Sequence, residues 1–448
     1  MTRGPATTVV CAGCGHVAPA DEPFPFRCPH AGEDDVDHVM ARELDPTHVT
    51  FPEEDEPNPF VRYRELFHAY HLGRAAGMSD ADHVHLVEQL AKAVEGVDGR
   101  GFVETPLRRS EELSKAIGCA VWVKDETGNV AGSHKGRHLV GLMIHLLVAE
   151  QAGLGAADGA ELAIASCGNA ALAAAAVARS VGRPIRVFVP EGADEHVLAR
   201  LRGLGAAVEV CEREPGTPGD PSHRALRRAV EGGAVPFTCQ GTDNGLTIEG
   251  GETLGYELVS QLSRAGEAID RLVVQVGGGA LASACVRAFE DAALLEAPER
   301  LPRIHAVQTR SAHPLERAFL RVRRHAGYET SPEGVVESMT WARTHRSEVM
   351  WPWEEPGRSL ADGMLDDEAY DWAAVVGGML ATDGTPVLVS EDVVHEANEL
   401  ARESTGIDVS HTGSAGLAGL LELARRGDLD PDERVAVIFT GARQAVAG

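Results

Sequence analysis

Lysine is scarce in this sequence of 448 residues, which contains only Lys92, Lys115, Lys124 and Lys135. Arginine carries nearly all of the remaining positive charge. An arginine can hold an ion pair, but it keeps its proton and does not form an imine. Any imine chemistry in this protein therefore depends on one of the four lysines.

Positive charge as a whole is also in short supply, with 41 Lys and Arg against 68 Asp and Glu, a net charge of −27 and a pI near 5.1. This balance argues against a nucleic-acid or anionic-membrane surface, so we expect neither as a partner. No signal-peptide core is recognisable near the N-terminus. The longest apolar run, 162–178, is interrupted by polar and glycine residues and does not read as a membrane span.

A disulfide framework is absent as well, because the eight cysteines are spread widely. We therefore expect a reducing, cytoplasmic location. Three of the cysteines fall in residues 1–45, where a Cys-x-x-Cys pair can present two thiolates to one tetrahedral Zn²⁺. The alternative is a segment with unpaired thiols. The predicted ligands of this structural zinc are Cys11, Cys14, Cys28 and either His30 or His38.

Residues 46–60 are acidic and rich in proline, which indicates a linker or a surface arm. The pattern then predicts helices over 63–71 and 80–94, with Ser79 as the cap of the second.

From Gly101 onward, short runs of β-branched residues alternate with glycines and helical segments. The expected strands are 121–124, 162–165, 185–189, 208–210, 272–276, 304–308 and 435–440. This order is typical of an α/β protein with buried parallel sheets.

Lys135 lies where one of these strands passes into a helix, bracketed by Gly132, Ser133 and Gly136. Free amide donors and the positive end of a helix dipole gather at such a point, which suits a phosphate. A lysine beside a glycine-rich turn favours a Schiff-base role. The alternative is a solvated lysine at the start of a helix.

Three more junctions have a similar character. The segment 166–169 (Ser-Cys-Gly-Asn) opens an alanine-rich helix, and its amides and Asn169 are suited to a carboxylate and a ring oxygen. The segment 277–281 (Gly-Gly-Gly-Ala-Leu) precedes an expected helix over 282–289, and its glycines let the backbone wrap closely around an anion. The third, 411–416, contains Ser414 and precedes an expected helix over 417–425.

Together these motifs resemble the fold type II family of pyridoxal-phosphate enzymes, which includes threonine synthase, the threonine and serine dehydratases, cysteine synthase and the tryptophan synthase β subunit. The similarity starts at Thr105-Pro106-Leu107 and reaches the C-terminus in the family's order. It implies two open, twisted, mostly parallel sheets flanked by helices, and a homodimer. The implied domains are a zinc ribbon-like segment (1–45), a linker with N-terminal helices (46–100), a large cofactor-binding domain (101–138 and 241–448) and a small α/β domain (139–240).

The resemblance also implies roles for individual residues. Lys135 would hold pyridoxal 5′-phosphate as an imine and remove the Cα proton of an amino-acid substrate. The implied cofactor-binding residues are Lys135, His134, Asn169, Gly277, Gly278, Gly279, Ala280, Leu281 and Ser414, with Ser414 against the pyridine nitrogen and packing as the alternative role of His134. The implied substrate-binding residues are Ser166, Cys167, Gly168, Asn169 and Ala170.

The implied activity is β-elimination or β-replacement on a small polar amino acid, as in threonine and serine dehydratases, through an aminoacrylate-type intermediate. The segments 277–281 and 359–363 look like those of dehydratases, whereas the N-terminal cysteines and 414–420 look like threonine synthase. Gly136 stands where threonine synthases usually carry aspartate. The alternatives are a threonine synthase-like enzyme acting on a phosphorylated amino acid, and a non-catalytic regulatory paralogue that binds the cofactor.

Overall fold

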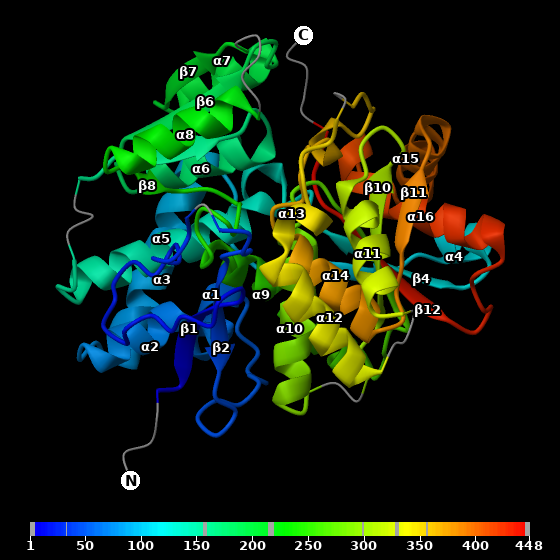
Figure 1. The fold of residues 1–448 in the computed structure, drawn as a ribbon, viewed down its shortest axis with the longest axis horizontal. Coiled ribbons are helices and arrows are strands. Elements are labelled where there is room, and N and C mark those ends of the chain that lie inside the picture. Colours follow the sequence, from blue (N-terminus) through cyan, green and yellow to red (C-terminus); the bar gives the residue numbers. More distant parts are fainter. Residues whose placement is uncertain are drawn as a thin grey trace.

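The computed structural model describes residues 5–32, 34–155, 159–213, 219–297, 300–327, 331–354 and 357–443. These residues form three sheets, of two, six and four strands. The smallest is an antiparallel pair, β1 (Thr7–Cys11) with β2 (Met40–Leu44), near the N-terminus. In Figure 1 the four-stranded sheet lies at the upper left and the six-stranded sheet at the right, with α9 and α10 near the centre.

The six-stranded sheet has the order β11-β10-β9-β12-β4-β3. All neighbouring strands are parallel except β3, which runs antiparallel to β4 at one edge. Its strands are β3 (Leu107–Arg109), β4 (Ala120–Asp125), β9 (Arg271–Gln275), β10 (Arg303–Thr309), β11 (Pro386–Val389) and β12 (Arg434–Phe439). The central strand β9 is buried along its whole length, as a strand with helices on both faces must be.

The four-stranded sheet is parallel throughout and has the order β7-β6-β5-β8. Its strands are β5 (Leu162–Ala165), β6 (Ile185–Pro190), β7 (Ala207–Cys211) and β8 (Val235–Pro236). All four fall inside the segment 139–240 that we expect to form the small domain. The division of the chain into domains remains a prediction.

Helices surround both sheets (Figure 1). The α-helices are α1 (Pro59–Arg62), α2 (His68–Ala75), α3 (Asp80–Asp98), α4 (Glu111–Ile117), α5 (Lys135–Gln151), α6 (Asn169–Ser180), α7 (Glu195–Gly203), α8 (Pro221–Glu231), α9 (Thr247–Ala265), α10 (Ala280–Leu294), α11 (Pro314–His325), α12 (Pro332–Thr344), α13 (Arg346–Val349), α14 (Trp372–Ala381), α15 (Glu391–Thr405) and α16 (His411–Arg426). The 3₁₀ turns are η1 (Arg64–Leu66), η2 (Val130–Gly132) and η3 (Asp362–Met364). Within the described ranges, no helix combines the length and the apolar character that crossing a bilayer requires.

The predicted strands are all present, with ends that differ from the expected ones by at most one residue. The Ser79 cap is also confirmed, and Asp82 bonds back to it as a capping box. The expectation of one continuous helix over 63–71 is wrong. Phe67 adopts an extended conformation (φ −95°, ψ 138°), so this stretch splits into η1 and α2.

A buried network of charged side chains joins β4, α5 and α9. Arg137 donates to Glu126 at 2.8 Å and to Glu257 at 2.7 Å, and Lys124 donates to Glu257 at 2.6 Å. Each of the four side chains is at most 1% exposed, and their charges sum to zero. Burial alone would raise the pKa of Glu126, but the adjacent Arg137 outweighs it and brings that pKa down to about 2.

Candidate functional site

The candidate site lies where the carboxyl ends of β4, β9 and β12 meet. These strands are parallel neighbours, and ligands of open α/β sheets bind at this edge. The turn from β4 to α5 crosses the end of β12, because Ser133 bridges to Gly441 and the His134 amide donates to the Thr440 carbonyl at 3.0 Å. Lys135, the first residue of α5, is therefore held beside the end of β12.

The turn before Lys135 is tight. Ala131 and Gly132 both have a positive φ, 55° and 74°, and Ala131 is one of the few non-glycine residues that do. Gly136 has little room for a side chain, since an added Cβ would lie 3.1 Å from the Cβ of Val130 and 3.3 Å from its carbonyl oxygen. This crowding gives a physical reason for glycine at the position where threonine synthases usually carry aspartate.

His134 forms part of the same turn. Its Nδ1 lies 3.2 Å from the Thr440 carbonyl, and its buried Nε2 has no partner within the described part of the chain. Burial and the adjacent Lys135 hold the pKa of His134 well below its usual range, so the ring is neutral near pH 7. The carbonyl then keeps the proton on Nδ1, and Nε2 is an acceptor. In this tautomer the ring accepts a hydrogen bond rather than donating one to a phosphate.

The glycines that follow β9 pack tightly against the segment 363–371. A Cβ on Gly277 would lie 2.5 Å from Asp366 Oδ2 and 2.8 Å from the Gly363 carbonyl, and Gly279 has φ +98°. Among the described residues, the amides of Gly277 and Gly279 donate to no backbone carbonyl. Glycine at these positions thus permits close backbone packing while leaving amide donors for an anion.

The segment 166–170 reaches the site from the other sheet. It follows β5, and α6 starts at Asn169 without a side-chain cap, so first-turn amides have no intrahelical acceptor. Asn169 Nδ2 would lie 3.0 Å from a Cβ on Gly441, which places this side chain at the end of β12. The Cys167 thiol is exposed, and its pKa is raised by desolvation and by Asp362, so its thiolate form is disfavoured.

Ser414 does not occupy the loop in which we expect it. The helix α16 starts at His411, six residues before the expected start, because Ser410 caps it by accepting from the Gly413 amide at 2.9 Å. Ser414 is consequently inside the helix and fully buried, and its hydroxyl accepts from Asn398 Nδ2 at 2.9 Å and donates to the Ser410 carbonyl at 3.1 Å. The expected helix boundary is wrong, and the Ser414 hydroxyl is satisfied within the protein.

Thr440 is a hydroxyl residue at the site that the sequence motifs do not reveal. It directly follows β12, is 3% exposed, and accepts from Gln275 Nε2 at 3.0 Å. Its carbonyl accepts the His134 amide, so it lies between the turn that carries Lys135 and the end of β9. In the sequence, the only sign that Thr440 lies at the site is its position at the carboxyl end of an expected parallel strand.

A second group of reactive side chains lies near the N-terminus. Cys11, Cys14, Cys28 and His38 have ligand atoms within 4.8 Å of one another. The Cys14 and Cys28 sulfurs are 3.6 Å apart, and Cys11 Sγ is 3.4 Å from His38 Nδ1. Ligands of one tetrahedral zinc are separated by about 3.8 Å for two sulfurs and about 3.5 Å for sulfur and nitrogen, given the usual bond lengths. These residues therefore fit one zinc ion.

His38 has the better surroundings for the fourth ligand. Its Nε2 lies 3.1 Å from Asp34, so a carboxylate orients the ring with Nδ1 toward the sulfurs, as is usual for a metal-bound histidine. His30 Nδ1 lies 3.6 Å from Cys14 Sγ but is not among the four mutually close groups.

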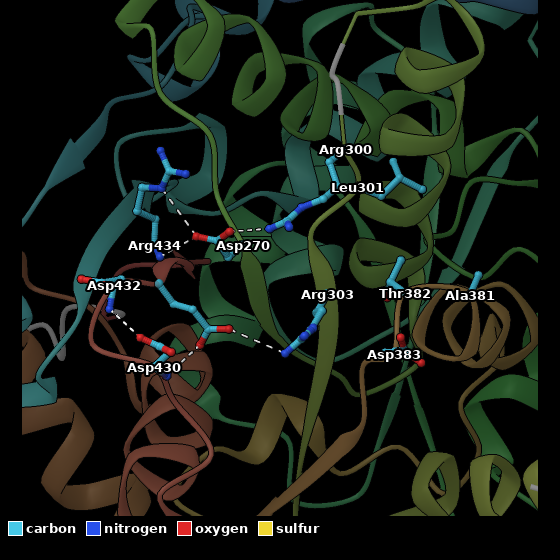
Figure 2. Close-up of a pocket in the computed structure, with 11 residues that line it drawn as sticks. Asp270, Arg300, Leu301, Arg303, Ala381, Thr382, Asp383, Asp430, Asp432 and Arg434 are labelled. Carbon is cyan, nitrogen blue, oxygen red and sulfur yellow. Dashed lines mark hydrogen bonds and ion pairs between the residues drawn. The ribbon is translucent and has the colours of Figure 1, made fainter. Parts of the chain in front are cut away.

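A separate hollow of about 520 Å³ is lined mainly by charged residues, which Figure 2 draws as sticks. Asp270, Arg303 and Arg434 lie at the amino ends of strands, and Thr440 follows Arg434 by six positions along β12. At about 3.3 Å per residue, that is roughly 20 Å. This hollow is therefore at the opposite edge of the sheet from Lys135, and it has no part in the candidate site.

Comparisons with known proteins identify the family. The model of the family described as "Pyridoxal-phosphate dependent enzyme" matches residues 100–441. The chain belongs to this family. It is 25% identical over 339 residues to a threonine synthase of Methanocaldococcus jannaschii, covering 75% of this chain and 74% of that protein. It is 30% identical over 290 residues to the serine dehydratase-like protein of Homo sapiens, covering 62% of this chain and 81% of that protein.

The fold agrees with this assignment. The structure of maize serine racemase superposes with a TM-score of 0.58 and 19% identity, covering 80% of this chain and 95% of the racemase. The predicted fold type II architecture is thus confirmed, and the chain is a pyridoxal-phosphate-dependent enzyme. The open amide donors after β9 and the lysine at the start of α5 fit the phosphate and the aldehyde of this cofactor.

We expect the loss of the Ser414 hydroxyl and the loss of the Thr440 hydroxyl to affect cofactor binding differently. Ser414→Ala removes a hydroxyl that bonds only within the protein, so we expect a loss of stability of about 1 kcal/mol and an unchanged cofactor Kd. Thr440→Val removes a hydroxyl at the site and should raise the Kd roughly fivefold, the equivalent of about 1 kcal/mol. Fluorescence titration of the apoenzyme with cofactor measures both. A raised Kd in Ser414→Ala with an unchanged Kd in Thr440→Val would contradict this expectation. It would support Ser414 as the residue against the pyridine nitrogen.

Proposed function

We propose that the chain catalyses β-elimination or β-replacement on a small polar amino acid, with Lys135 as the cofactor lysine. The position of Lys135 at the start of α5, beside the ends of β12 and β9, carries this proposal. Of the other lysines, Lys124 is fully buried and bonded to Glu257, whereas Lys92 and Lys115 are exposed on α3 and α4. Lys135 is thus the lysine that the fold brings to the site.

Each part of the site has a distinct task in this proposal. The amides after β9 and the α5 terminus bind the phosphate, and the 166–170 segment binds the substrate carboxylate. Asn169 orients the cofactor ring. When bound, the cofactor supplies an electron sink for the negative charge that develops at Cα. The Lys135 amine takes the Cα proton, and the turn at 131–136 holds this amine in place.

Two sequence features favour elimination over the threonine synthase-like alternative. The segments 277–281 and 359–363 resemble those of dehydratases, and Gly136 stands where threonine synthases usually carry aspartate. Lys135, the two segments proposed to bind anions and Thr440 support an enzyme rather than the non-catalytic alternative. The homodimer and the cytoplasmic location remain predictions.

The reaction is tested by product analysis. Holoenzyme supplied in turn with serine, threonine, diaminopropionate and homoserine phosphate should release a 2-oxo acid and ammonia from at least one of the first three. Lys135→Ala should release neither, and Lys92→Ala, an exposed lysine on another helix, serves as the matched control. Pyridoxamine phosphate accumulating without any 2-oxo acid or substituted amino acid would contradict the proposal.

We also propose that Cys11, Cys14, Cys28 and His38 bind one structural zinc ion. The proposal is supported by three thiols and one imidazole at the edge lengths of a tetrahedron, with Asp34 orienting the imidazole. The acid–base groups of the site lie elsewhere, so this metal would stabilise the fold rather than take part in the reaction.

Metal analysis of the purified protein should find about one zinc per chain. Cys28→Ser and His38→Ala should lower this content, while His30→Ala, the matched histidine control, should retain it. Loss of zinc in His30→Ala with retention in His38→Ala would show that His30, and not His38, is the fourth ligand. A metal analysis that finds no zinc in the wild-type protein would contradict the proposal.

A further inference from the structure

A histidine–aspartate pair that has no part in the site described so far joins α8 to the loop before α9. His223 Nε2 lies 2.7 Å from Asp243 Oδ2, and the two side chains are largely buried, with 12% and 9% exposed. Arg227 Nε approaches the other oxygen of the carboxylate at 3.9 Å. A carboxylate bonded to one nitrogen of an imidazole orients the ring and leaves the second nitrogen for a ligand.

The pair lies at the same sheet edge as the proposed substrate-binding segment 166–170. His223 is the third residue of α8, a helix that packs on β5 and β6 (Figure 1) and follows β7 in the chain. Asp243 is in the loop that leaves the carboxyl end of β8, the strand next to β5. Because the strands of this sheet are all parallel, the start of α8, the loop and the segment 166–170 share its carboxyl edge.

Two sets of contacts connect the pair to the glycines that follow β9. The ring of Tyr370 would come within 3.0 Å of a Cβ on Gly278, and the centroid of this ring is 5.5 Å from that of His223. On the other side, the amide of Asp371 donates to the Gly278 carbonyl at 2.9 Å. Its carboxylate accepts the Gly241 amide at 3.4 Å, two residues before the aspartate of the pair. The pair therefore lies between the proposed substrate-binding segment and the proposed phosphate-binding turn.

The second nitrogen of His223 is open. Within the described residues, Nδ1 forms no hydrogen bond, and it is not among the nitrogens that the fold buries without a partner, so a ligand or solvent can reach it. In the same loop as Asp243, Gln240 Oε1 and Thr242 Oγ1 are buried and have no partner in that part of the chain. Buried oxygens are normally hydrogen-bonded, so these two are an independent sign of a polar ligand beside the loop.

Loss of a hydroxyl group from Cβ requires a proton donor. Hydroxide is a strong base and a poor leaving group, so the Cβ–O bond breaks readily only if the oxygen gains a proton as it leaves. Lys135 has the opposite task in the proposed function, because its amine takes a proton from Cα. The Cys167 thiol of the substrate-binding segment is a weaker acid than an imidazolium, and burial raises its pKa further.

We propose that His223, oriented by Asp243, is the general acid that protonates the oxygen leaving Cβ. The inference rests on the proposed function and adds the proton donor to it. The Cα–H bond breaks as Lys135 takes the proton, and the Cβ–O bond breaks with its electron pair on oxygen. His223 Nδ1 gives its proton to that oxygen, so water leaves while the Cα–Cβ double bond forms. Hydrolysis of the unsaturated product gives a 2-oxo acid and ammonia, and solvent returns a proton to His223.

Two substrates that differ in the leaving group test this role in the holoenzyme. L-Serine loses hydroxide, which needs a proton, whereas β-chloro-L-alanine loses chloride, which does not. His223→Gln should lower kcat for serine by about 100-fold, a usual contribution of general acid catalysis, and kcat for chloroalanine by less than about threefold. His196→Gln makes the same change at an exposed position in the first turn of α7 and should alter neither value.

Asp243→Asn keeps the proposal testable if His223→Gln does not fold. Without the carboxylate the imidazole is less well oriented, so kcat for serine should fall about tenfold more than kcat for chloroalanine. Equal losses on the two substrates, or no loss on serine, would show that the pair only supports the structure. That result would overturn the general acid and leave the proposed elimination intact. If the wild-type holoenzyme releases no 2-oxo acid from either substrate and its absorbance does not change on adding amino acids, the proposed function is wrong and this inference with it.

Discussion

Two carboxylates and two cations are buried together where β4, α5 and α9 meet. Removing four charges from water costs several kcal/mol per ion, and only close, fully bonded pairing recovers it. Arg137 contributes most of that pairing, with bonds to Glu126 and Glu257, and it follows Lys135 by two residues. Loss of one partner of such a network typically costs about 3–5 kcal/mol, so the start of α5 has one strongly preferred position. The placement of Lys135, the proposed cofactor lysine, depends on this constraint.

The N-terminal segment around the proposed zinc ligands is hydrogen-bonded to the residues just before α9 and to α13. Phe26, close to Cys28, accepts the Gly245 amide at 2.9 Å just before α9, and the Arg346 amide donates to the Asp35 carbonyl at 3.0 Å. These bonds tie the residues around the proposed zinc ligands to helices on both sides. Gly245 is itself pressed against Met40, where an added Cβ would lie 1.9 Å from the carbonyl. Zinc would stabilise a segment that packs on the catalytic body rather than an independent module.

Local patterns in the sequence were enough to predict the strands and to place Lys135 at a strand–helix junction. Buried parallel strands need continuous β-branched runs, and a lysine between glycines at a strand–helix junction has few alternatives. The start of α16 was expected too late because the glycines at 413 and 416 look like a loop, whereas the Ser410 cap starts the helix at His411. The role of Ser414 stays a prediction. Thr440 and Asp366 could not be found from local pattern, since each acquires its surroundings from segments distant in the chain. The choice of His38 over His30 likewise depends on folding, through Asp34 and Cys11.

The central claim is that the buried network presents Lys135, and no other lysine, to the cofactor. Borohydride reduction of the holoenzyme followed by peptide mass spectrometry tests it directly. The account predicts a pyridoxyl phosphate adduct on Lys135 alone, with Lys124 unmodified because its amine is fully buried and bonded to Glu257 at 2.6 Å. An adduct on Lys124, or on an exposed lysine with Lys135 unmodified, would contradict the account.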